Sequence, residues 1–306
     1  MSETDAPLLL AEGLTKYYGR QLGCREVSFA LYEGEVLAVV GESGSGKTTL
    51  LQLLSTQLAP SAGRVRYRLR DGVTRDLAEL SEAERRFLFR TDWGYVHQDA
   101  ALGLRMNVSA GANVGERLMA VGWRHYGRVR AAAAEWLERV EIPADRIDDP
   151  PTTFSGGANV GERLMAVGWR HYGRIRATAE DWLDRVEIDA ARIDEAPLTY
   201  SGGMRQRLQI ARNLVSAPRL VFMDEPTGGL DVSVQARLLD LVRGLVNELG
   251  LAAIVVTHDL AVARLLSHRV MVMKAGRVIE TGLTDQVLDD PREPYTQLLV
   301  SSILPP

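Results

Sequence analysis

The stretch Gly41-Glu42-Ser43-Gly44-Ser45-Gly46-Lys47-Thr48 decides the fold of this chain. It fits the pattern G-x-x-x-x-G-K-[ST], in which a glycine-rich loop binds phosphate groups. An apolar run over 36–40 precedes it and is typical of a buried strand, and residues 49–54 follow with the pattern of a helix start. A glycine-rich turn that fitted by chance would not bring this strand–loop–helix context with it. The sequence therefore predicts a phosphate-binding loop.

The residue types of the loop explain the chemistry. Glycine lets the backbone point several N–H groups into one concavity, which suits phosphate oxygens, and the helix that follows adds the positive end of its dipole. Lys47 is expected to reach the β- and γ-phosphates, and the Thr48 hydroxyl is expected to ligate Mg²⁺. The residues expected to hold a nucleotide are Gly41, Ser43, Gly44, Ser45, Gly46, Lys47, Thr48 and Thr49.

Composition and charge exclude several classes of protein. The chain has 306 residues, of which 46% are hydrophobic and 25% charged, as is ordinary for a globular protein. Its net charge of −4 lacks the basic excess of a typical nucleic-acid-binding domain. The lone cysteine, Cys24, excludes an internal disulfide and favours a reducing compartment. The acidic N-terminus is unlike a signal peptide, and no apolar stretch reaches the roughly 18 residues that span a bilayer. We expect a cytoplasmic protein without direct membrane insertion.

Periodicity and turn signals predict an α/β chain. Alternating or apolar runs bounded by turn residues predict strands at 8–10, 27–31, 65–69, 94–98, 220–224, 253–258 and a hairpin over 270–280. Helices are expected at 81–90, where a serine and a glutamate form a capping box, and at 232–249. A short apolar helix is expected to close the chain.

Two strand ends carry candidate catalytic groups. The apolar strand over 220–224 ends in Asp224 and Glu225, and in phosphate-loop enzymes the acidic residue at such a position holds Mg²⁺. We assign Asp224 to the metal and Glu225 to orienting or deprotonating the attacking water. The alternative is a simple capped strand end. The strand over 253–257 leads to His258, which is either structural or placed to sense the γ-phosphate.

Two further polar residues have two interpretations each. Tyr18 lies ahead of the phosphate loop and either stacks on a nucleotide base, since every base has a π-face, or simply ends a strand. Gln98 follows a predicted strand and either reaches the metal or the catalytic water, or is an ordinary polar loop residue. For each residue, the sequence does not decide between the two interpretations.

An internal repeat occupies the middle of the chain. Residues 111–128 recur without change at 157–174, and similarity continues so that 111–156 matches 157–202. Apolar residues at helical spacing predict two helices in each copy. Two copies are too few for a solenoid, so we interpret them as a tandem duplication inside one helical subdomain. The sequence leaves open whether the duplication is natural and which copy is the extra one.

The copies end in different surroundings. Ser155-Gly156-Gly157 leads into the next copy, whereas Ser201-Gly202-Gly203 leads into a basic amphipathic run over 204–214. A helix that starts with a serine and two glycines offers a second anion site, or else an ordinary N-cap turn. We expect only the second of the two to function as an anion site, because only it precedes the basic helix and the strand that ends in Asp224.

With these motifs in order, the chain resembles the ATP-binding cassette (ABC) ATPases from about residue 8 to 303. Gly41–Thr48 resembles the Walker A loop, Gln98 the Q-loop glutamine and Ser201-Gly202-Gly203 the family signature. The strand ending in Asp224 resembles Walker B. Tyr18, Glu225, Asp231 and His258 resemble the adenine-stacking aromatic, the catalytic glutamate, the D-loop aspartate and the switch histidine. The signature departs from the usual pattern at Tyr200 and Met204, where Leu and Gln are common.

Within the family, the chain is similar to ATP-binding subunits of carbon–phosphorus lyase systems for phosphonates. The segments that carry this similarity are 115–120, 124–127, 152–157 and 226–237. The tail over 294–299 is also similar to importers of dipeptides and nickel, which keeps a transporter role open. A third hypothesis is an ATP-binding scaffold in which the duplication has disabled hydrolysis, although both phosphate-handling carboxylates are present.

The resemblance implies an architecture and partners. It implies one ABC ATPase domain over 1–306, with a RecA-like core and an antiparallel β-subdomain in 1–98 and 216–306, and an α-helical subdomain in 99–215. It also implies that ATP and Mg²⁺ bind between the Walker A loop of one subunit and the signature of a second, in a homodimer or heterodimer. The implied docking partner is a soluble carbon–phosphorus lyase core complex. The ATPase itself is not expected to cleave the C–P bond of the phosphonate.

The choice between the two signatures is testable. Ser201→Arg should abolish ATP hydrolysis, because it places a bulky cation at the working signature, and Ser155→Arg should leave the rate close to that of the wild type. Steady-state phosphate release measures the rate of ATP hydrolysis in both variants. Loss of activity in Ser155→Arg alone would reverse the assignment.

Overall fold

The structure is a computed structural model that describes residues 6–107, 113, 117, 118, 121, 172–195 and 201–302. The chain divides into two compact units, of which the first comprises residues 1–98 and 218–306 and the second residues 99–217. Among the described residues, no helix has the length and apolar character needed to cross a membrane.

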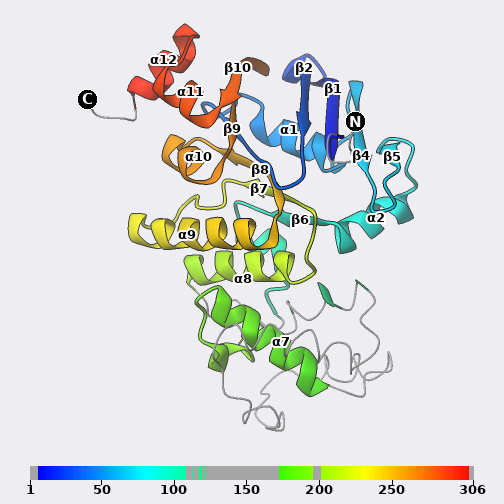
Figure 1. Cartoon of the computed structure of the whole chain (residues 1–306), viewed down its shortest axis with the longest axis vertical. Coiled ribbons are helices and arrows are strands. Elements are labelled where there is room, and N and C mark those ends of the chain that lie inside the picture. Colours follow the sequence, from blue (N-terminus) through cyan, green and yellow to red (C-terminus); the bar gives the residue numbers. More distant parts are fainter. Residues whose placement is uncertain are drawn as a thin grey trace. The chain divides into compact units, whose positions relative to one another are not determined.

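A six-stranded sheet forms the centre of the first unit (Figure 1). Its strands, in spatial order, are β10 (Arg277–Leu283), β9 (Arg269–Lys274), β3 (Val36–Val40), β8 (Ala252–Thr257), β7 (Leu220–Asp224) and β6 (Trp93–Val96). All neighbours are parallel except β9 and β10, which form an antiparallel hairpin. The carboxyl ends of β3, β6, β7 and β8 therefore meet at one edge of the sheet, where ligands of open α/β sheets bind.

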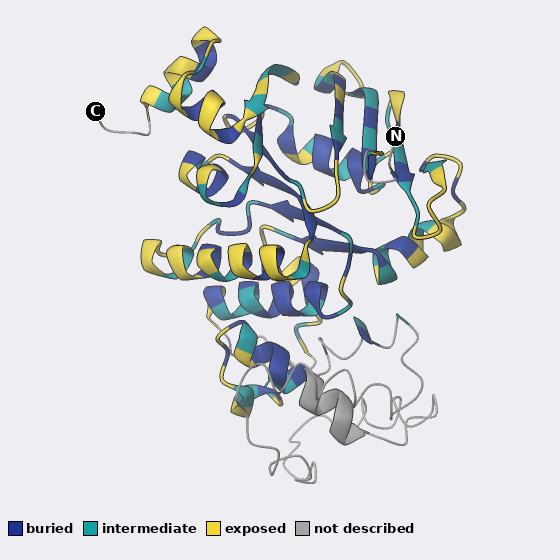
Figure 2. Cartoon of the chain, in the orientation of Figure 1, coloured by how far each residue is buried: buried dark blue, intermediate teal, exposed yellow. Residues whose placement is uncertain are grey.

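The central strands are apolar throughout because both faces of the sheet are covered. Every residue of β3, β7 and β8 is buried, and Figure 2 shows these strands in dark blue. Helices on the two faces explain why the strands are continuous runs of Val, Leu, Ile and Phe instead of alternating. The predicted strands at 36–40, 220–224 and 253–257 are thereby confirmed.

A second, antiparallel sheet of four strands belongs to the same unit. Its order is β2 (Gln21–Leu31), β1 (Leu9–Tyr18), β4 (Ala62–Arg68) and β5 (Thr74–Asp76). The helix α1 (Lys47–Leu54) contributes four buried leucines to a core that also holds residues of both sheets. The phosphate loop thus leads into a helix that is anchored in the main hydrophobic core.

Of the remaining helices of this unit, α2 (Glu82–Thr91) starts at a side-chain cap. This helix begins at Ser81, whose hydroxyl and backbone form the predicted capping box with Glu84. Helix α9 (Val232–Leu249) has the predicted bounds. Helices α10 (Leu260–Leu266), α11 (Thr284–Asp289) and α12 (Pro294–Ser301) follow, and residues of all three pack with β3 and β9 in a second core cluster. Helix α11 was not predicted, because its six residues are too few to show a period.

The second unit is helical in its described residues. It contains α3 (Ala100–Gly103), α7 (Tyr172–Arg185), the short 3₁₀ turn η3 (Ala190–Arg192) and α8 (Gly202–Leu214). Ser201 is the N-cap of α8, and its hydroxyl accepts the backbone N–H of Met204, which is the N-cap turn that the sequence offered beside the anion site. Helices α3 and α8 approach closely at Gly103, where a Cβ would lie 2.1 Å from the side-chain oxygen of Gln209. The first copy's Ser155-Gly156-Gly157 lies outside the described residues.

We expected the displaced copy of the repeat to expose apolar residues, either Leu118, Val121, Trp123 and Trp136 or Leu164, Val167, Trp169 and Trp182. The structure describes Leu118, Val121 and Trp182 among these. Leu118 and Trp182 are buried, and Val121 is partly buried. Leu118 and Val121 of the first copy therefore do not show the exposure expected of a displaced copy, and the burial of Trp182 fits a second copy that is in place.

A buried polar network ties the two sheets of the first unit together. The Tyr67 hydroxyl on β4 donates to the Asp92 carboxylate at 2.5 Å, and the backbone N–H of Arg219 donates to the Asp92 carbonyl at 2.8 Å. The Tyr67 ring also meets Trp93 edge-on, with centroids 5.2 Å apart. Tyr67 and Asp92 are almost wholly buried, so the Tyr67 hydroxyl depends on Asp92 for its hydrogen bond, while the Asp92 carboxylate also pairs with Arg70 at 2.5 Å and Arg219 at 3.6 Å.

Tyr67→Phe should lower the free energy of unfolding by about 1–3 kcal/mol, because it keeps the ring but leaves a buried carboxylate oxygen short of a donor. Urea unfolding followed by tryptophan fluorescence measures the change. Tyr32→Phe is the matched control, since Tyr32 is exposed. Equal stability of the two variants would show that the network contributes nothing.

Candidate functional site

The phosphate loop crosses from the end of β3 to the start of α1 in a backbone conformation that requires glycine. Gly41 has φ 149°, and a Cβ there would lie 2.2 Å from the carbonyl oxygen of Met273 on β9. Gly46 has φ 101°, and its Cβ would lie 2.2 Å from the carbonyl oxygen of Gly23 on β2. Strands on two sides therefore fix the loop and exclude any side chain at these two positions.

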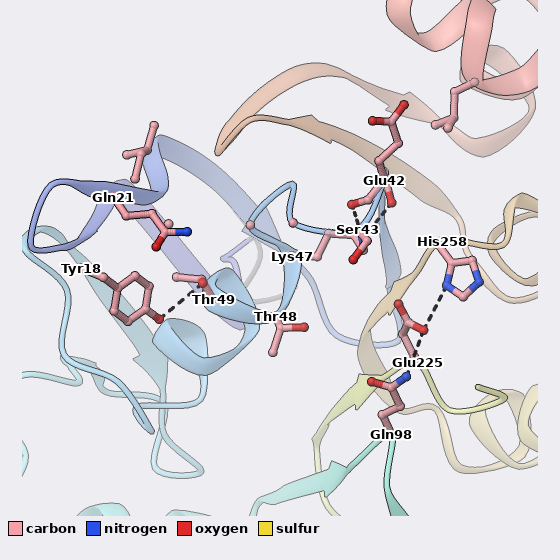
Figure 3. Close-up of a pocket in the computed structure, with 16 residues that line it drawn as sticks. Tyr18, Gln21, Glu42, Ser43, Lys47, Thr48, Thr49, Gln98, Glu225 and His258 are labelled. Atoms are coloured by element: carbon pink, nitrogen blue, oxygen red, sulfur yellow. Dashed lines mark hydrogen bonds and ion pairs between the residues drawn. The ribbon is translucent and has the colours of Figure 1, made fainter. Parts of the chain in front are cut away.

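A cavity of about 680 Å³ opens beside this loop (Figure 3). This volume lies within the range of small-molecule sites in proteins. The cavity brings together residues predicted from separate motifs: Tyr18, Gly41, Ser43, Gly44, Gly46, Lys47, Thr48, Thr49, Gln98, Glu225 and His258. It is also lined by residues that sequence reasoning did not select: Gln21, Leu22, Gly23, Glu42 and Leu299.

Lys47 folds back over its own loop. Its ammonium donates to the carbonyl oxygens of Gly41 at 2.7 Å and Glu42 at 2.9 Å. Burial lowers the pKa of this ammonium, and the nearby carboxylates of Glu225 and Asp224 oppose that shift. The ammonium is thus held at the mouth of the loop by neutral oxygens, which a phosphate group with full negative charge would replace.

Thr48 and Asp224 form a pair of oxygen ligands. The Thr48 hydroxyl at the start of α1 donates to the Asp224 carboxylate at the end of β7, at 3.1 Å. Burial is the largest cause that raises the pKa of Asp224; repulsion from Glu225 adds to it, while the Thr48 hydrogen bond and Lys47 oppose it. A hydroxyl and a carboxylate side by side suit a hard cation such as Mg²⁺.

Glu225 is the meeting point of three strand ends. Its carboxylate lies 3.0 Å from Nδ1 of His258, which follows β8, and accepts from the Gln98 amide, which follows β6, at 3.4 Å (Figure 3). Its backbone has φ 44°, an unusual conformation for a residue with a side chain, held by its N–H donating to Val256 at 2.8 Å. The predicted carboxylate, histidine and glutamine therefore converge at one point of the cavity.

Tyr18 lies at the opposite end of the cavity. Its hydroxyl is 3.4 Å from the Thr49 hydroxyl, and its ring is exposed. A Cβ on Gly23 would lie 2.9 Å from both the Tyr18 ring and the Thr49 methyl group, so glycine is needed between them. An exposed ring at the rim of a cavity is free to stack on a base.

Some predicted site residues lie outside the cavity lining, Asp224 among them. Ser45 lies in the phosphate loop, and its hydroxyl is buried without a hydrogen-bond partner among the residues that the structure describes. Asp231 is the N-cap residue of α9. Ser201, Gly202 and Gly203 begin α8 in the other unit.

These features fit a nucleoside triphosphate with its cation. The buried, unpartnered Ser45 hydroxyl and the glycine loop offer donors and space to phosphate oxygens. Within the described ranges, no cluster of three or more His, Cys, Asp or Glu residues could hold a metal. A cation at Thr48 and Asp224 would therefore take most of its other ligands from phosphate and water, as Mg²⁺ does in nucleotide sites.

Comparison with known proteins agrees with this chemistry. The sequence profile of the ABC transporter family matches residues 24–228. The ATP-binding protein PhnK of Escherichia coli K12, named for phosphonates utilization, is 56% identical over 98% of this chain and 99% of its own length. A Brucella ovis protein named for peptide import is 32% identical over 99% of this chain and 80% of its own length.

Solved structures show the same fold. The dimeric structure of MJ0796, a bacterial ABC transporter cassette, superimposes with a TM-score of 0.65. It is 25% identical to this chain, and the match covers 90% of this chain and 98% of that structure. The α/β fold with an antiparallel sheet and a helical part, predicted from the sequence, is thereby confirmed.

Asp224→Asn should stabilise the nucleotide-free protein at pH 7, with a rise in Tm of about a few degrees. A raised pKa means that the folded state binds the proton more tightly than the unfolded chain does, so the ionised carboxylate weakens folding above that pKa. The gain should shrink as the pH falls through the folded pKa towards about 3.9, where both states are protonated.

Thermal unfolding in a chelator, at several pH values, measures this difference. Asp240→Asn is the control, since Asp240 is exposed on α9. A variant that is less stable than the wild type at pH 7 would contradict the expected direction of the effect.

Proposed function

The chain belongs to the ABC transporter family of ATPases, and from this premise we propose that it is the ATP-hydrolysing subunit of a phosphonate utilisation system. The observation that carries the proposal is the 56% identity to PhnK of Escherichia coli, which extends over nearly the whole of both chains. The peptide import relative shares much less, at 32%. The similarity to PhnK thus includes the middle of the chain as well as the nucleotide-binding motifs.

We propose these roles for the residues of the cavity. Lys47 and the N–H groups of the loop bind the β- and γ-phosphates, and Tyr18 stacks on the base. Thr48, Asp224 and Gln98 would hold Mg²⁺, which would supply positive charge to the phosphate oxygens.

The water that attacks the γ-phosphate is oriented by Glu225, which takes its proton. The 3.0 Å contact between His258 Nδ1 and the Glu225 carboxylate supports a role for this histidine in fixing that carboxylate.

A second subunit completes the site in this proposal. Ser201, Gly202 and Gly203 at the start of α8 would contact the γ-phosphate bound to the partner, and Asp231 would contact the partner across the interface. The support is the Ser201 cap at an open helix N-terminus and the dimeric form of the MJ0796 cassette. ATP binding would close this dimer, and hydrolysis would open it.

The domain boundaries remain a proposal as well. We propose one ABC ATPase domain over 1–306, with the nucleotide-binding core in 1–98 and 216–306 and the helical subdomain in 99–215. The division of the chain into units 1–98 with 218–306 and 99–217 supports boundaries near these residues.

The proposal also concerns the partner on which the subunit works. We propose that the subunit works in the cytosol on a soluble carbon–phosphorus lyase core complex and remodels it through the nucleotide cycle. The second candidate is the ATPase of a membrane importer, favoured by the relatives named for peptide import and by the tail over 294–299. The two differ in whether the partner is soluble or spans the membrane.

Glu225→Gln should reduce ATP hydrolysis by a factor of about 10²–10⁴ and leave ATP binding intact, because the amide cannot accept the proton of the water. Phosphate release and the binding of a fluorescent ATP analogue measure the two effects. Glu79→Gln, at an exposed position, is the matched control. A wild-type protein without measurable hydrolysis would instead support the inactive scaffold.

Co-purification tests the partner. The tagged chain from a host grown on a phosphonate should bring down a soluble multi-subunit complex from the cytosolic fraction. A polytopic permease from solubilised membranes would establish the importer instead. If the chain comes alone, the same experiment with residues 111–156 deleted tests whether the repeat blocks docking.

A further inference from the structure

One peptide of the phosphate loop is held from two sides. It is the peptide that joins Gly41 to Glu42, and its carbonyl oxygen, that of Gly41, accepts from the Lys47 ammonium at 2.7 Å. Its N–H, that of Glu42, donates to the Tyr295 hydroxyl at 3.4 Å, a long hydrogen bond. This peptide therefore connects the lysine that meets phosphate with a side chain far along the chain, near its C-terminal end.

Tyr295 has a fixed position on α12. It follows Pro294 at the first turn of the helix and is buried. The Lys274 ammonium at the end of β9 lies 4.2 Å from the centre of its ring, a distance at which a cation is attracted to the ring face. One turn further along α12, Leu299 lines the nucleotide cavity. The same face of the helix thus carries the contact with Glu42 and one residue of the cavity lining.

The start of α12 is fixed separately. The Glu280 carboxylate on β10 accepts the backbone N–H groups of Arg292 at 3.0 Å and Glu293 at 3.2 Å. A carboxylate at a helix N-terminus satisfies otherwise unpaired N–H groups and suits the helix dipole. This contact sets the direction in which α12 leaves the sheet, and therefore where Tyr295 meets the loop.

We propose that Tyr295 is a positioning residue for ATP binding, and that α12 is coupled to the nucleotide through the chain Lys47–Glu42–Tyr295. In the empty loop, Lys47 and Tyr295 together hold the Gly41–Glu42 peptide, one at its carbonyl oxygen and the other at its N–H. A phosphate that draws the Lys47 ammonium away from the Gly41 carbonyl leaves Tyr295 as the group that keeps this peptide oriented. The proposal requires only that the cavity binds ATP, and it does not depend on phosphonates or on the docking partner.

Coupling of this kind acts in both directions. If ATP changes how tightly the loop holds α12, then displacement of α12 changes the affinity for ATP by the same factor. A side chain that merely filled space would lack this property, because phenylalanine fills almost the same space as tyrosine. Removal of the Tyr295 hydroxyl therefore tests the coupling.

Tyr295→Phe should raise the dissociation constant of a fluorescent ATP analogue about two- to fivefold, the effect of one modest hydrogen bond, with little change in kcat. Glu280→Gln should shift the constant in the same direction by loosening α12 at its start. Leu298→Ala, at an exposed position of the same helix, should leave it unchanged. An unchanged or lower constant in Tyr295→Phe would overturn the positioning role.

The reverse direction needs a reporter on α12. Cys24, the chain's lone cysteine, is fully buried, and burial raises the pKa of its thiol to about 11, so a thiol-reactive dye should spare it. In Leu298→Cys, the dye should report ATP addition by a fluorescence change that is lost when Tyr295→Phe is added. A dye on Val73→Cys, at an exposed site on the loop between β4 and β5, should not respond.

A response at position 298 that persists in Tyr295→Phe would show that the coupling runs by another route. The absence of any response, in a protein that binds the analogue, would overturn the coupling itself. Failure to bind the analogue at all would contradict the proposed ATP site instead, so the two proposals fail in distinguishable ways.

Discussion

The site depends on a loop whose backbone is packed so closely against its neighbours that two of its positions have no room for a side chain. Gly41 and Gly46 lie against carbonyl oxygens of β9 and β2, at distances that leave no room for a Cβ. At the same loop, the N–H of Gly276 at the β9–β10 turn donates to the Ser45 carbonyl at 3.0 Å. The phosphate loop is thus shaped by segments far away in the chain, and its N–H groups are in place before any ligand arrives. Preorganisation of this kind spares the loop from ordering itself upon binding.

The charges around the loop are held at a cost to stability. Burial lowers the pKa of Lys47 and raises that of Asp224, so both groups are less easily ionised here than in water. Buried charges of this kind are retained only where partners compensate them, and in the empty site their hydrogen-bond partners are neutral oxygens and one hydroxyl, while Lys47 and the two carboxylates compensate one another only in part. A triphosphate with its cation would supply further opposite charges to both. The arrangement therefore favours the folded, loaded protein over the folded, empty one.

The sequence predicted those parts of the site that local pattern determines. Strand ends at Asp224 and His258, the loop over 41–48 and the Ser201 cap follow from runs of apolar residues and from turn chemistry, which are local. Gly23 and Tyr295 were missed because they matter only through their packing against the phosphate loop. They lie far from the loop in the sequence, and no local pattern links them to it. The length of β1 was missed for a similar reason. The apolar run at 8–10 is only its start, and pairing with β2 and β4 extends it to Tyr18 despite several register shifts.

The two copies of the repeat carry the same helix-forming run, so they compete for the same packing position against α8. In the described residues, α7 of the second copy contacts α8 and buries Leu183 and Val186. The corresponding segment of the first copy lies one full repeat further from α8 along the chain. Closing that longer loop costs about 1 kcal/mol more, because the entropy cost of closure rises with the logarithm of loop length. The two copies have nearly equal side chains to bury, so this difference in entropy cost favours the copy that is joined directly to α8. The Ser-Gly-Gly that begins α8 therefore belongs to the copy whose helix packs against α8.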